Sequence, residues 1–225
     1  TIADLYNERS PLYEKYAEIL FSKQKLYPCS CSRKKLFEEN PVNADGEVIY
    51  SGHCLKNPID KNSDFALRFK TPDKTITWED LLLGKFEENP KNQCGDFTIK
   101  DRISQWTYQF AVCVDDLEEN IGLVVRGEDL RNSTARQIVL SEALGRKTPP
   151  LYLHHPLLTE KSGEKLSKRQ HSKSLRAELE QGLSIEDLLG LVCYEAHSIP
   201  KKAPLTLNEA IYSIQKTYFS CFLKK

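Results

Sequence analysis

Two short apolar runs that stop at acidic residues set the strongest limit on how this 225-residue chain can fold. FAVCVDD covers residues 110–116 and GLVVRGEDL covers 122–130. We interpret both as buried strands, because strands that end in a polar cluster are typical of α/β proteins whose sites lie at the carboxyl edge of a sheet. The run STARQIVLSEALG that follows predicts a helix over 133–145, capped by Ser133 or Thr134 and ended by Gly145.

Weaker patterns predict elements on either side of these runs. Apolar residues at helical spacing predict a helix over 11–26, with Pro11 in its first turn. Residues 27–32 are typical of a strand or knuckle, and a short helix capped by Ser32 follows. A turn is predicted at Asp45-Gly46, and the alternation in 65–70 predicts a strand. Further predictions are a strand or turn leading into a short helix and a second strand over 76–88, and mostly helices after residue 175, one of them preceded by Ser184.

The charge and hydropathy patterns exclude two broad classes of partner. Lys plus Arg equals Asp plus Glu at 32 each, so no global field draws in nucleic acid and an RNA contact needs a local patch. No apolar run reaches the roughly 18 residues that a membrane span requires, and we expect no membrane partner. No signal-peptide pattern is visible, so we expect a cytoplasmic protein.

The stretch GEKLSKRQHS, residues 163–172, predicts a basic loop. Leu166 anchors one side of this loop, so Lys165 and Lys168 point the other way, towards an anion. Lysine acts on phosphate as a mobile point charge, which suits charge that moves during a reaction. The alternative is an ordinary solvated surface turn.

Three of the seven cysteines form a cluster in the sequence. Cys29-Ser-Cys31 is followed by Tyr50-Ser-Gly-His53-Cys54, and three thiolates with a neighbouring histidine and tyrosine can form a tetrahedral zinc site. The alternative is that the three are packed thiols and His53 is a turn residue. The remaining cysteines are scattered singly and are predicted to be small buried hydrophobes: Cys94, Cys113, Cys193 and Cys221.

Arg126, at the end of the second apolar run, is a candidate anion-binding residue. A buried arginine is costly unless it meets an anion, and its fork geometry suits a carboxylate. The alternative is an internal salt bridge to Asp115, Asp116 or Asp129.

Taken in order, these motifs resemble the class I aminoacyl-tRNA synthetases. KLSKR is similar to the second signature loop of that family, and VVRGEDL, a T-x-R-Q helix, YLHHPL and GEKLSKR follow one another as in its glutamyl branch. The pattern C-x-C…Y-x-G-H-C and the ending KLSKRQHSKSL are most similar to the glutamyl-Q tRNA(Asp) synthetases. Those enzymes resemble the catalytic half of a glutamyl-tRNA synthetase without the anticodon-binding domain. The resemblance covers residues 5–190.

The resemblance implies an α/β fold. It is a Rossmann-type class I synthetase catalytic domain, with a small zinc-binding insertion and a helical C-terminal region. The implied divisions are a catalytic-domain helix in 1–26, the insertion in 27–95, the second half of the catalytic domain with the KLSKR loop in 96–175, and the helical region in 176–225. The first signature motif of the family does not occur in 1–225, so we expect a fragment whose N-terminal part lies outside this chain.

The implied activity is the ATP-dependent activation of glutamate and transfer of the glutamyl group to queuosine in the anticodon of tRNA(Asp). Such an enzyme uses ATP with magnesium as a substrate, contains structural zinc and acts as a monomer. The resemblance assigns catalysis to Lys168 and Lys165, ATP binding to Lys168 and Ser167, and glutamate binding to Tyr108 and Arg126. It assigns zinc to Cys29, Cys31, Tyr50 and Cys54. A phenolate ligand is unusual, so His53 remains a rival for the fourth position.

Three other interpretations remain open. The chain could be part of a glutamyl-tRNA synthetase. It could belong to a glutaminyl-type synthetase, which the cysteine cluster disfavours. A third interpretation is a catalytically inactive tRNA-binding module.

Overall fold

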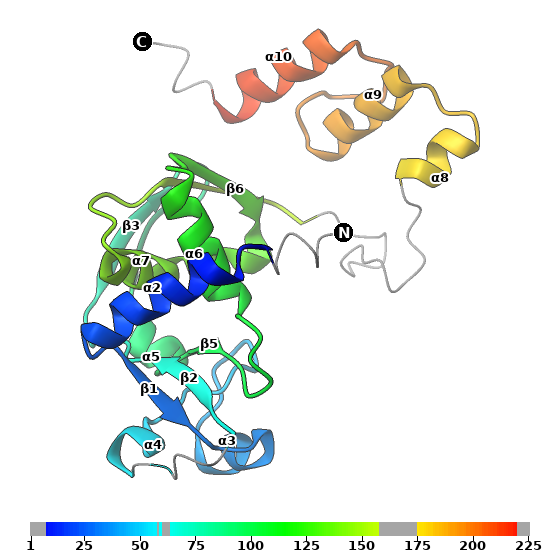
Figure 1. Ribbon diagram of the computed structural model, residues 1–225. Helices are drawn as coiled ribbons and strands as arrows, with labels where there is room; N and C mark the ends of the chain where they lie inside the picture. Colours follow the sequence, from blue (N-terminus) through cyan, green and yellow to red (C-terminus); the bar gives the residue numbers. More distant parts are fainter. Residues whose placement is uncertain (1–7, 58, 60–63, 158–174, 220–225) are drawn as a thin grey trace. The chain divides into compact units, whose positions relative to one another are not determined.

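The computed structural model describes residues 8–57, 59, 64–157 and 175–219 of the chain. The described residues fall into two compact units, one drawn from Thr1–Arg126 and Leu130–His154 and the other from Gly127–Asp129 and His155–Lys225. The first unit contains two sheets with helices packed around them, and the second is helical (Figure 1). Across the described ranges, no helix has both the length and the hydropathy that crossing a membrane requires.

The smaller sheet of the first unit is antiparallel, in the order β1-β2-β5. Its strands are β1 (Leu26–Cys29), β2 (Ala66–Phe69) and β5 (Thr98–Lys100). The strand predicted at 65–70 is thus confirmed with slightly different ends, and of the two alternatives for 27–32, a strand or a knuckle, the strand forms over 26–29. Register places Cys29 opposite Ala66, at the end of the sheet from which the chain enters α3 (Arg33–Glu39).

Local signals in this region are also confirmed. Ser32 caps α3 by accepting a hydrogen bond from the backbone N–H of Lys35. The turn at Asp45-Gly46 forms, with the N–H of Gly46 donating to the carbonyl of Asn43. Two further short helices are α4 (His53–Lys56) and α5 (Pro90–Cys94).

The second sheet has the order β4-β3-β7-β6 and is mixed. Its strands are β3 (Ile76–Asp80), β4 (Gly84–Glu88), β6 (Leu123–Gly127) and β7 (Leu151–His155). β3 and β4 form an antiparallel hairpin, whereas β3 and β7 run parallel. The two strands expected within 76–88 are confirmed, but a turn rather than a short helix joins them.

The prediction that 110–116 and 122–130 are both buried strands was wrong in its first half. FAVCVDD lies in helix α6 (Tyr108–Glu118), where Phe110, Ala111, Cys113 and Val114 are buried on one face. Those four positions fit the helical period, and a short apolar run does not distinguish a strand from a buried helix segment.

The second half of that prediction was right about the strand and wrong about its burial. β6 is exposed at Leu123 and Val125, and Arg126 is its one buried residue. Among the described strands, β6 lies at one edge of its sheet. The polar segment after it forms the 3-10 helix η1 (Glu128–Ser133).

Three helices build the main core of the first unit. These are α2 (Ser10–Ser22), α6 and α7 (Thr134–Leu144), which pack against one another (Figure 1). α2 starts near Pro11 as predicted but ends four residues earlier than the predicted end at 26. α7 ends at Gly145, whose φ of +112° favours glycine, as predicted. Ser133 precedes α7 without capping it, and Thr134 is already helical.

The second unit contains α8 (Leu175–Glu180), α9 (Ile185–Glu195) and α10 (Leu207–Tyr218). Ser184 begins α9 with a capping box shared with Asp187, which confirms the predicted helix start. Gly190 lets α9 approach the following linker closely, since a Cβ there would lie 1.8 Å from the carbonyl oxygen of Ala203.

Candidate functional site

The three clustered cysteines meet in space at the end of β1. Within the described ranges, the sulfur atoms of Cys29, Cys31 and Cys54 form the one group of metal-binding side chains whose ligand atoms lie within 4.8 Å of one another. The hydroxyl of Tyr50 lies 3.4 Å from Sγ of Cys29 and 3.6 Å from Sγ of Cys31. A tetrahedral zinc ion with thiolate bonds of about 2.3 Å needs donors at this kind of mutual distance. The donor set therefore fits zinc.

The ring of Tyr50 is fixed from two sides. Its hydroxyl accepts a hydrogen bond of 2.9 Å from the backbone N–H of Cys54. The guanidinium of Arg68 lies 3.8 Å from the centroid of the Tyr50 ring and makes a cation–π contact with it. His53, the rival for the fourth position, is not in the metal-binding group. The geometry thus favours Tyr50 over His53 as the fourth neighbour of the three sulfurs.

When no ion is bound, the pKa values of the Cys31 and Cys54 thiols shift in opposite directions. Burial raises the pKa of the Cys31 thiol to about 11. Burial also acts on Cys54, but hydrogen bonds from Tyr50 and Cys31 outweigh it and lower the pKa of the Cys54 thiol to about 7. The Cys54 sulfur thus becomes a thiolate near neutral pH, whereas the Cys31 thiol keeps its proton. A divalent cation would favour the thiolate form of the whole set.

The scattered cysteines that the structure describes follow the simpler prediction. Cys94, Cys113 and Cys193 are each 2% exposed. Burial raises the pKa of the Cys94 thiol to about 11 and that of Cys113 to about 12. They are buried hydrophobes, as expected, and Cys221 lies outside the described residues.

A second polar cluster surrounds Arg126. Its Nε donates to Nε2 of His154 at 2.9 Å, one terminal nitrogen donates to Oε1 of Gln137 at 2.7 Å, and the other donates to Oγ1 of Thr134 at 2.9 Å. All three acceptors are neutral. The alternative was an internal salt bridge to Asp115, Asp116 or Asp129, but the hydrogen bonds described for Arg126 go to other residues, and Asp115 pairs with Arg9. Together with Asp80, these residues form the Arg126 cluster: Arg126, His154, Gln137, Thr134 and Asp80.

Asp80 enters the cluster through His154. Its Oδ2 lies 2.7 Å from Nδ1 of His154 and accepts the backbone N–H of the same residue at 3.0 Å. Both side chains are fully buried. Asp80 stands at the end of β3 and His154 on the parallel neighbour β7, so the parallel pairing of these strands brings them together.

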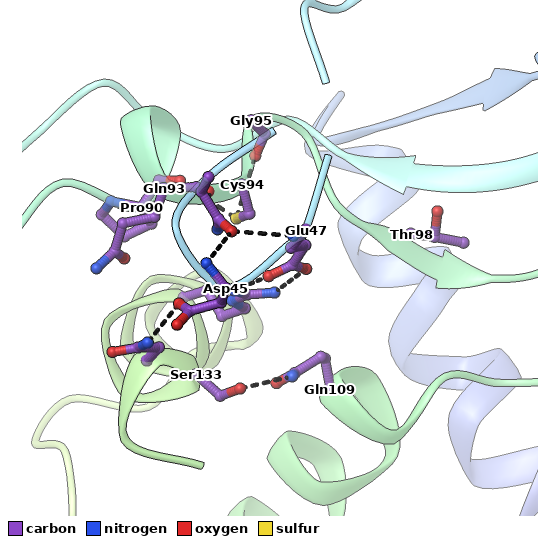
Figure 2. Close-up of polar contacts among 12 residues, drawn as sticks. Asp45, Glu47, Pro90, Gln93, Cys94, Gly95, Thr98, Gln109 and Ser133 are labelled. Atoms are coloured by element: carbon purple, nitrogen blue, oxygen red, sulfur yellow. Dashed lines mark hydrogen bonds and ion pairs between the residues drawn. The ribbon is translucent and has the colours of Figure 1, made fainter. Parts of the chain in front are cut away.

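A chain of amides links the Arg126 cluster to helix α6. Nε2 of Gln137 donates to Oε1 of Gln109 at 2.8 Å. Nε2 of Gln109 in turn donates to Oγ of Ser133 at 2.8 Å (Figure 2). Gln109 directly follows Tyr108, which is the first residue of α6 and is 50% exposed. The hydrogen-bonded path from Arg126 therefore reaches Gln109, the covalent neighbour of Tyr108, the other residue predicted to bind glutamate.

The turn that follows α3 is fastened to the start of α7. Both carboxylate oxygens of Glu47 lie 2.6 Å from the guanidinium of Arg136, and Asn132 donates to Asp45 at 2.5 Å (Figure 2). Arg136 is 4% exposed, so this bidentate pair anchors the predicted insertion to the helix that also holds Gln137 and Thr134.

The residues predicted to carry out catalysis and to bind ATP, Lys165, Ser167 and Lys168, lie in 158–174, outside the described residues. By contrast, the structure reveals polar residues that sequence reasoning did not select: Asp80, Gln109, Thr134 as an acceptor, Gln137 and His154. The sequence does contain a clue to His154, because a histidine inside the apolar run YLHHPL is unexpected. The run does not indicate which residues His154 contacts.

Comparison with known proteins identifies the family. The family described as tRNA synthetases class I (E and Q), catalytic domain, matches residues 5–201. A glutamyl-Q tRNA(Asp) synthetase of Geobacter sulfurreducens is 37% identical over 173 residues, which is 76% of this chain and 55% of that protein. A protein of the same name from Nitratidesulfovibrio vulgaris is 33% identical over 208 residues, 88% of this chain and 64% of its own length.

The fold comparison agrees with the sequence comparison. The crystal structure of a glutamate-tRNA synthetase from Elizabethkingia anophelis superimposes with a TM-score of 0.67, at 23% identity, over 94% of this chain and 54% of that one. The likeness to this protein concerns the fold. The chain spans between half and two thirds of the length of these relatives.

Proposed function

Because the chain belongs to the class I tRNA synthetase (E and Q) catalytic-domain family, we propose that the full-length protein activates glutamate with ATP and transfers it to queuosine in the anticodon of tRNA(Asp). The curated relatives at 33% and 37% identity are named for that reaction. The observation that carries the glutamate part is the state of Arg126, which is buried, charged and surrounded by neutral acceptors.

Arg126 has hydrogen-bonding capacity left for a substrate carboxylate. A guanidinium has five N–H groups, and the three recorded bonds leave two of them, one on each terminal nitrogen. A carboxylate that binds there gains charge-assisted hydrogen bonds in a site with little water. The side-chain carboxylate of glutamate is our proposed occupant, and Tyr108, at the start of α6, is the second proposed contact.

The KLSKR loop is the proposed site for the phosphates of ATP. When the carboxylate of glutamate attacks the α-phosphorus, negative charge grows on the phosphoryl oxygens and on the leaving pyrophosphate. Lys168, with Lys165 beside it, would stabilise this charge more strongly in the transition state than in bound ATP, and Ser167 would contact ATP. Magnesium bound to ATP would supply further neutralisation.

Zinc is proposed as a structural ion held by Cys29, Cys31, Tyr50 and Cys54. Bound there, it would crosslink β1 to the start of α4 and supply folding free energy to this part of the chain. The proposed insertion at 27–95 would then be a unit with its own metal, attached to the catalytic half through Glu47 and Arg136.

Amino-acid-dependent exchange of pyrophosphate into ATP tests the proposed activation step. The full-length protein, assayed with its cognate tRNA, should support exchange with glutamate and support it at least about a hundredfold less with glutamine, because a site built around one charged contact rejects the analogue that lacks it. Equal exchange with both amino acids would contradict Arg126 as a carboxylate-binding residue. Exchange with neither would support the inactive tRNA-binding module.

A further inference from the structure

We infer that the buried pair Asp80–His154 is the positioning element that sets the orientation of the Arg126 guanidinium, so that its free N–H groups face the glutamate carboxylate. This inference rests on the proposed function, since it assigns a role within the same site. His154 contacts Arg126 directly, and Asp80 contacts His154. His154 and Asp80 are therefore positioning residues, and their effect is exerted through the arginine.

The hydrogen bonds fix which nitrogen of His154 holds the proton. The guanidinium of Arg126 has no acceptor, so Nε2 of His154 must accept the bond from Nε of Arg126. The proton then sits on Nδ1 and is donated to Oδ2 of Asp80, 2.7 Å away. The hydroxyl of Thr134, 3.4 Å from Nε2, is compatible with the same tautomer because a hydroxyl can donate to it.

Asp80 is held firmly enough to act as the fixed end of this arrangement. Its Oδ1 accepts the backbone N–H groups of Leu82 and Leu83, both at 2.9 Å. Its Oδ2 accepts the backbone N–H and ring N–H of His154. Four donors saturate the carboxylate, and three of them are backbone groups, which do not rotate. The hydrogen bond from Nδ1 to this fixed carboxylate therefore sets the orientation of the His154 ring.

The ring must stay neutral for the arrangement to persist. Burial lowers the pKa of His154, the charge of Arg126 acts in the same direction, and the bond to Asp80 opposes both without cancelling them. The charged groups that face the ring are Asp80 on β3, Arg126 on β6 and Arg131 on η1. Protonated His154 would point an N–H at Arg126 and lose the bond between them, so neutrality preserves the acceptor.

Fixing Nε fixes the direction of the rest of the guanidinium, because the group is planar. With Nε held by β7 and the two terminal nitrogens held by α7, the remaining N–H groups have one available orientation. A substrate carboxylate meets donors that need no rearrangement, which is the general advantage of preorganisation. Without the histidine acceptor, Nε–H would remain buried and unpaired, at a cost that rotation of the guanidinium would relieve.

Two substitutions of His154 separate its two bonds. In His154→Gln the side-chain amide reaches the position of Nε2, so it can still accept from Arg126 but no longer donates to Asp80. In His154→Asn the shorter amide occupies the position of Nδ1, so it can still donate to Asp80 but leaves Nε of Arg126 without its acceptor. The two variants differ by one methylene and share the same amide chemistry.

The inference is tested on the full-length protein by glutamate-dependent pyrophosphate exchange. His154→Asn should raise the KM for glutamate about tenfold or more, while the KM for ATP and kcat stay within about threefold of the unaltered protein. His154→Gln should raise the KM for glutamate less than about threefold. In parallel, NMR detection of the Arg126 Nε–H signal should show fast proton exchange in His154→Asn and protection in His154→Gln.

The opposite ranking would overturn the inference, because it would show that the bond to Asp80 stabilises the fold and that the bond to Arg126 is dispensable. Equal effects of the two variants on KM and on Nε–H protection would overturn it as well. Failure of the proposed function is recognised separately, before any variant is made. In that case the unaltered protein supports no glutamate-dependent exchange.

Discussion

The Arg126 cluster and the cysteine cluster solve the problem of burying polar groups in different ways. The Arg126 cluster draws its residues from β3, β6, β7 and α7, and each recorded donor already meets an acceptor inside the protein. The cysteine cluster comes from a short stretch of chain, and its sulfurs contact mainly one another and one phenol. The first is held in place by its own hydrogen bonds and keeps two N–H groups of Arg126 for a ligand, whereas the sulfurs of the second would be joined by an ion.

This difference predicts different responses to perturbation. A preorganised cluster should lose ligand affinity when its geometry changes, even if the fold persists. A cluster that an ion completes should lose local structure when the ion is removed, with little direct effect on chemistry elsewhere. The four predictions that follow test this contrast, in order of decreasing effect.

Arg126→Lys should have the largest effect, a loss of about a thousandfold in kcat/KM for glutamate, or roughly 4 kcal/mol. Lysine keeps the charge but lacks the planar fork that bonds to His154, Gln137 and Thr134. Steady-state exchange kinetics measure the loss. The exposed Arg102→Lys is the matched control and should leave kcat/KM unchanged. Normal glutamate use by Arg126→Lys would show that Arg126 is an internal structural residue.

Lys168→Ala should reduce glutamyl-adenylate formation about a hundredfold, roughly 3 kcal/mol, with little change in ATP affinity. The reason is that Lys168 is proposed to stabilise charge that develops in the transition state. Rapid-quench measurement of adenylate and equilibrium binding of ATP separate the two quantities. Lys173→Ala, in the same basic segment, serves as the control. An unchanged rate of adenylate formation would remove Lys168 from the mechanism.

Tyr50→Phe should weaken zinc binding about 10-fold to 100-fold, while His53→Ala should leave it nearly unchanged. The phenol oxygen contacts two of the three sulfurs, whereas His53 lies outside the metal-binding group. Competition with a chromophoric chelator measures both affinities. If His53→Ala is the weaker binder, the fourth ligand is His53. Less than about a tenth of an equivalent of zinc after metal-supplemented expression would leave three packed thiols and no metal site.

Glu47→Ala should have the smallest effect, a loss of about 1–2 kcal/mol in the free energy of unfolding. The substitution leaves Arg136 buried without its bidentate partner. Glu38→Ala removes an equally charged but exposed i,i+4 partner of Lys34 and should cost only about a few tenths of that amount. Urea denaturation of both variants measures the difference. Equal losses in the free energy of unfolding would show that the Glu47–Arg136 pair stabilises the protein no more than an exposed ion pair does.

The sequence predicted more of the cysteine cluster than of the Arg126 cluster, for a physical reason. Cys29, Cys31, Tyr50 and Cys54 lie close in the sequence, and a turn at Asp45-Gly46 lets the chain reverse, so local patterns are informative. The partners of Arg126 come from strands that are neighbours only in the folded sheet. Parallel pairing of β3 with β7 is a long-range event that no local pattern encodes.

The error over residues 110–116 has a related cause. A seven-residue apolar run fits both a strand and one face of a helix, and the deciding factor is packing against α2 and α7. The helices with capping signals were predicted well, because a cap at Ser32 or Ser184 depends on residues within one turn.

Transfer of labelled glutamate to tRNA tests the central claim most directly. The full-length protein would be incubated with ATP, magnesium and radioactive glutamate, together with tRNA(Asp) that contains queuosine, tRNA(Asp) that lacks it, or tRNA(Glu). We predict label on the queuosine-containing tRNA(Asp) alone, in a form that survives removal of the 3′-terminal adenosine. Label on the 3′ end of tRNA(Glu) would instead show a glutamyl-tRNA synthetase, and label on none of the three would contradict the proposed enzyme.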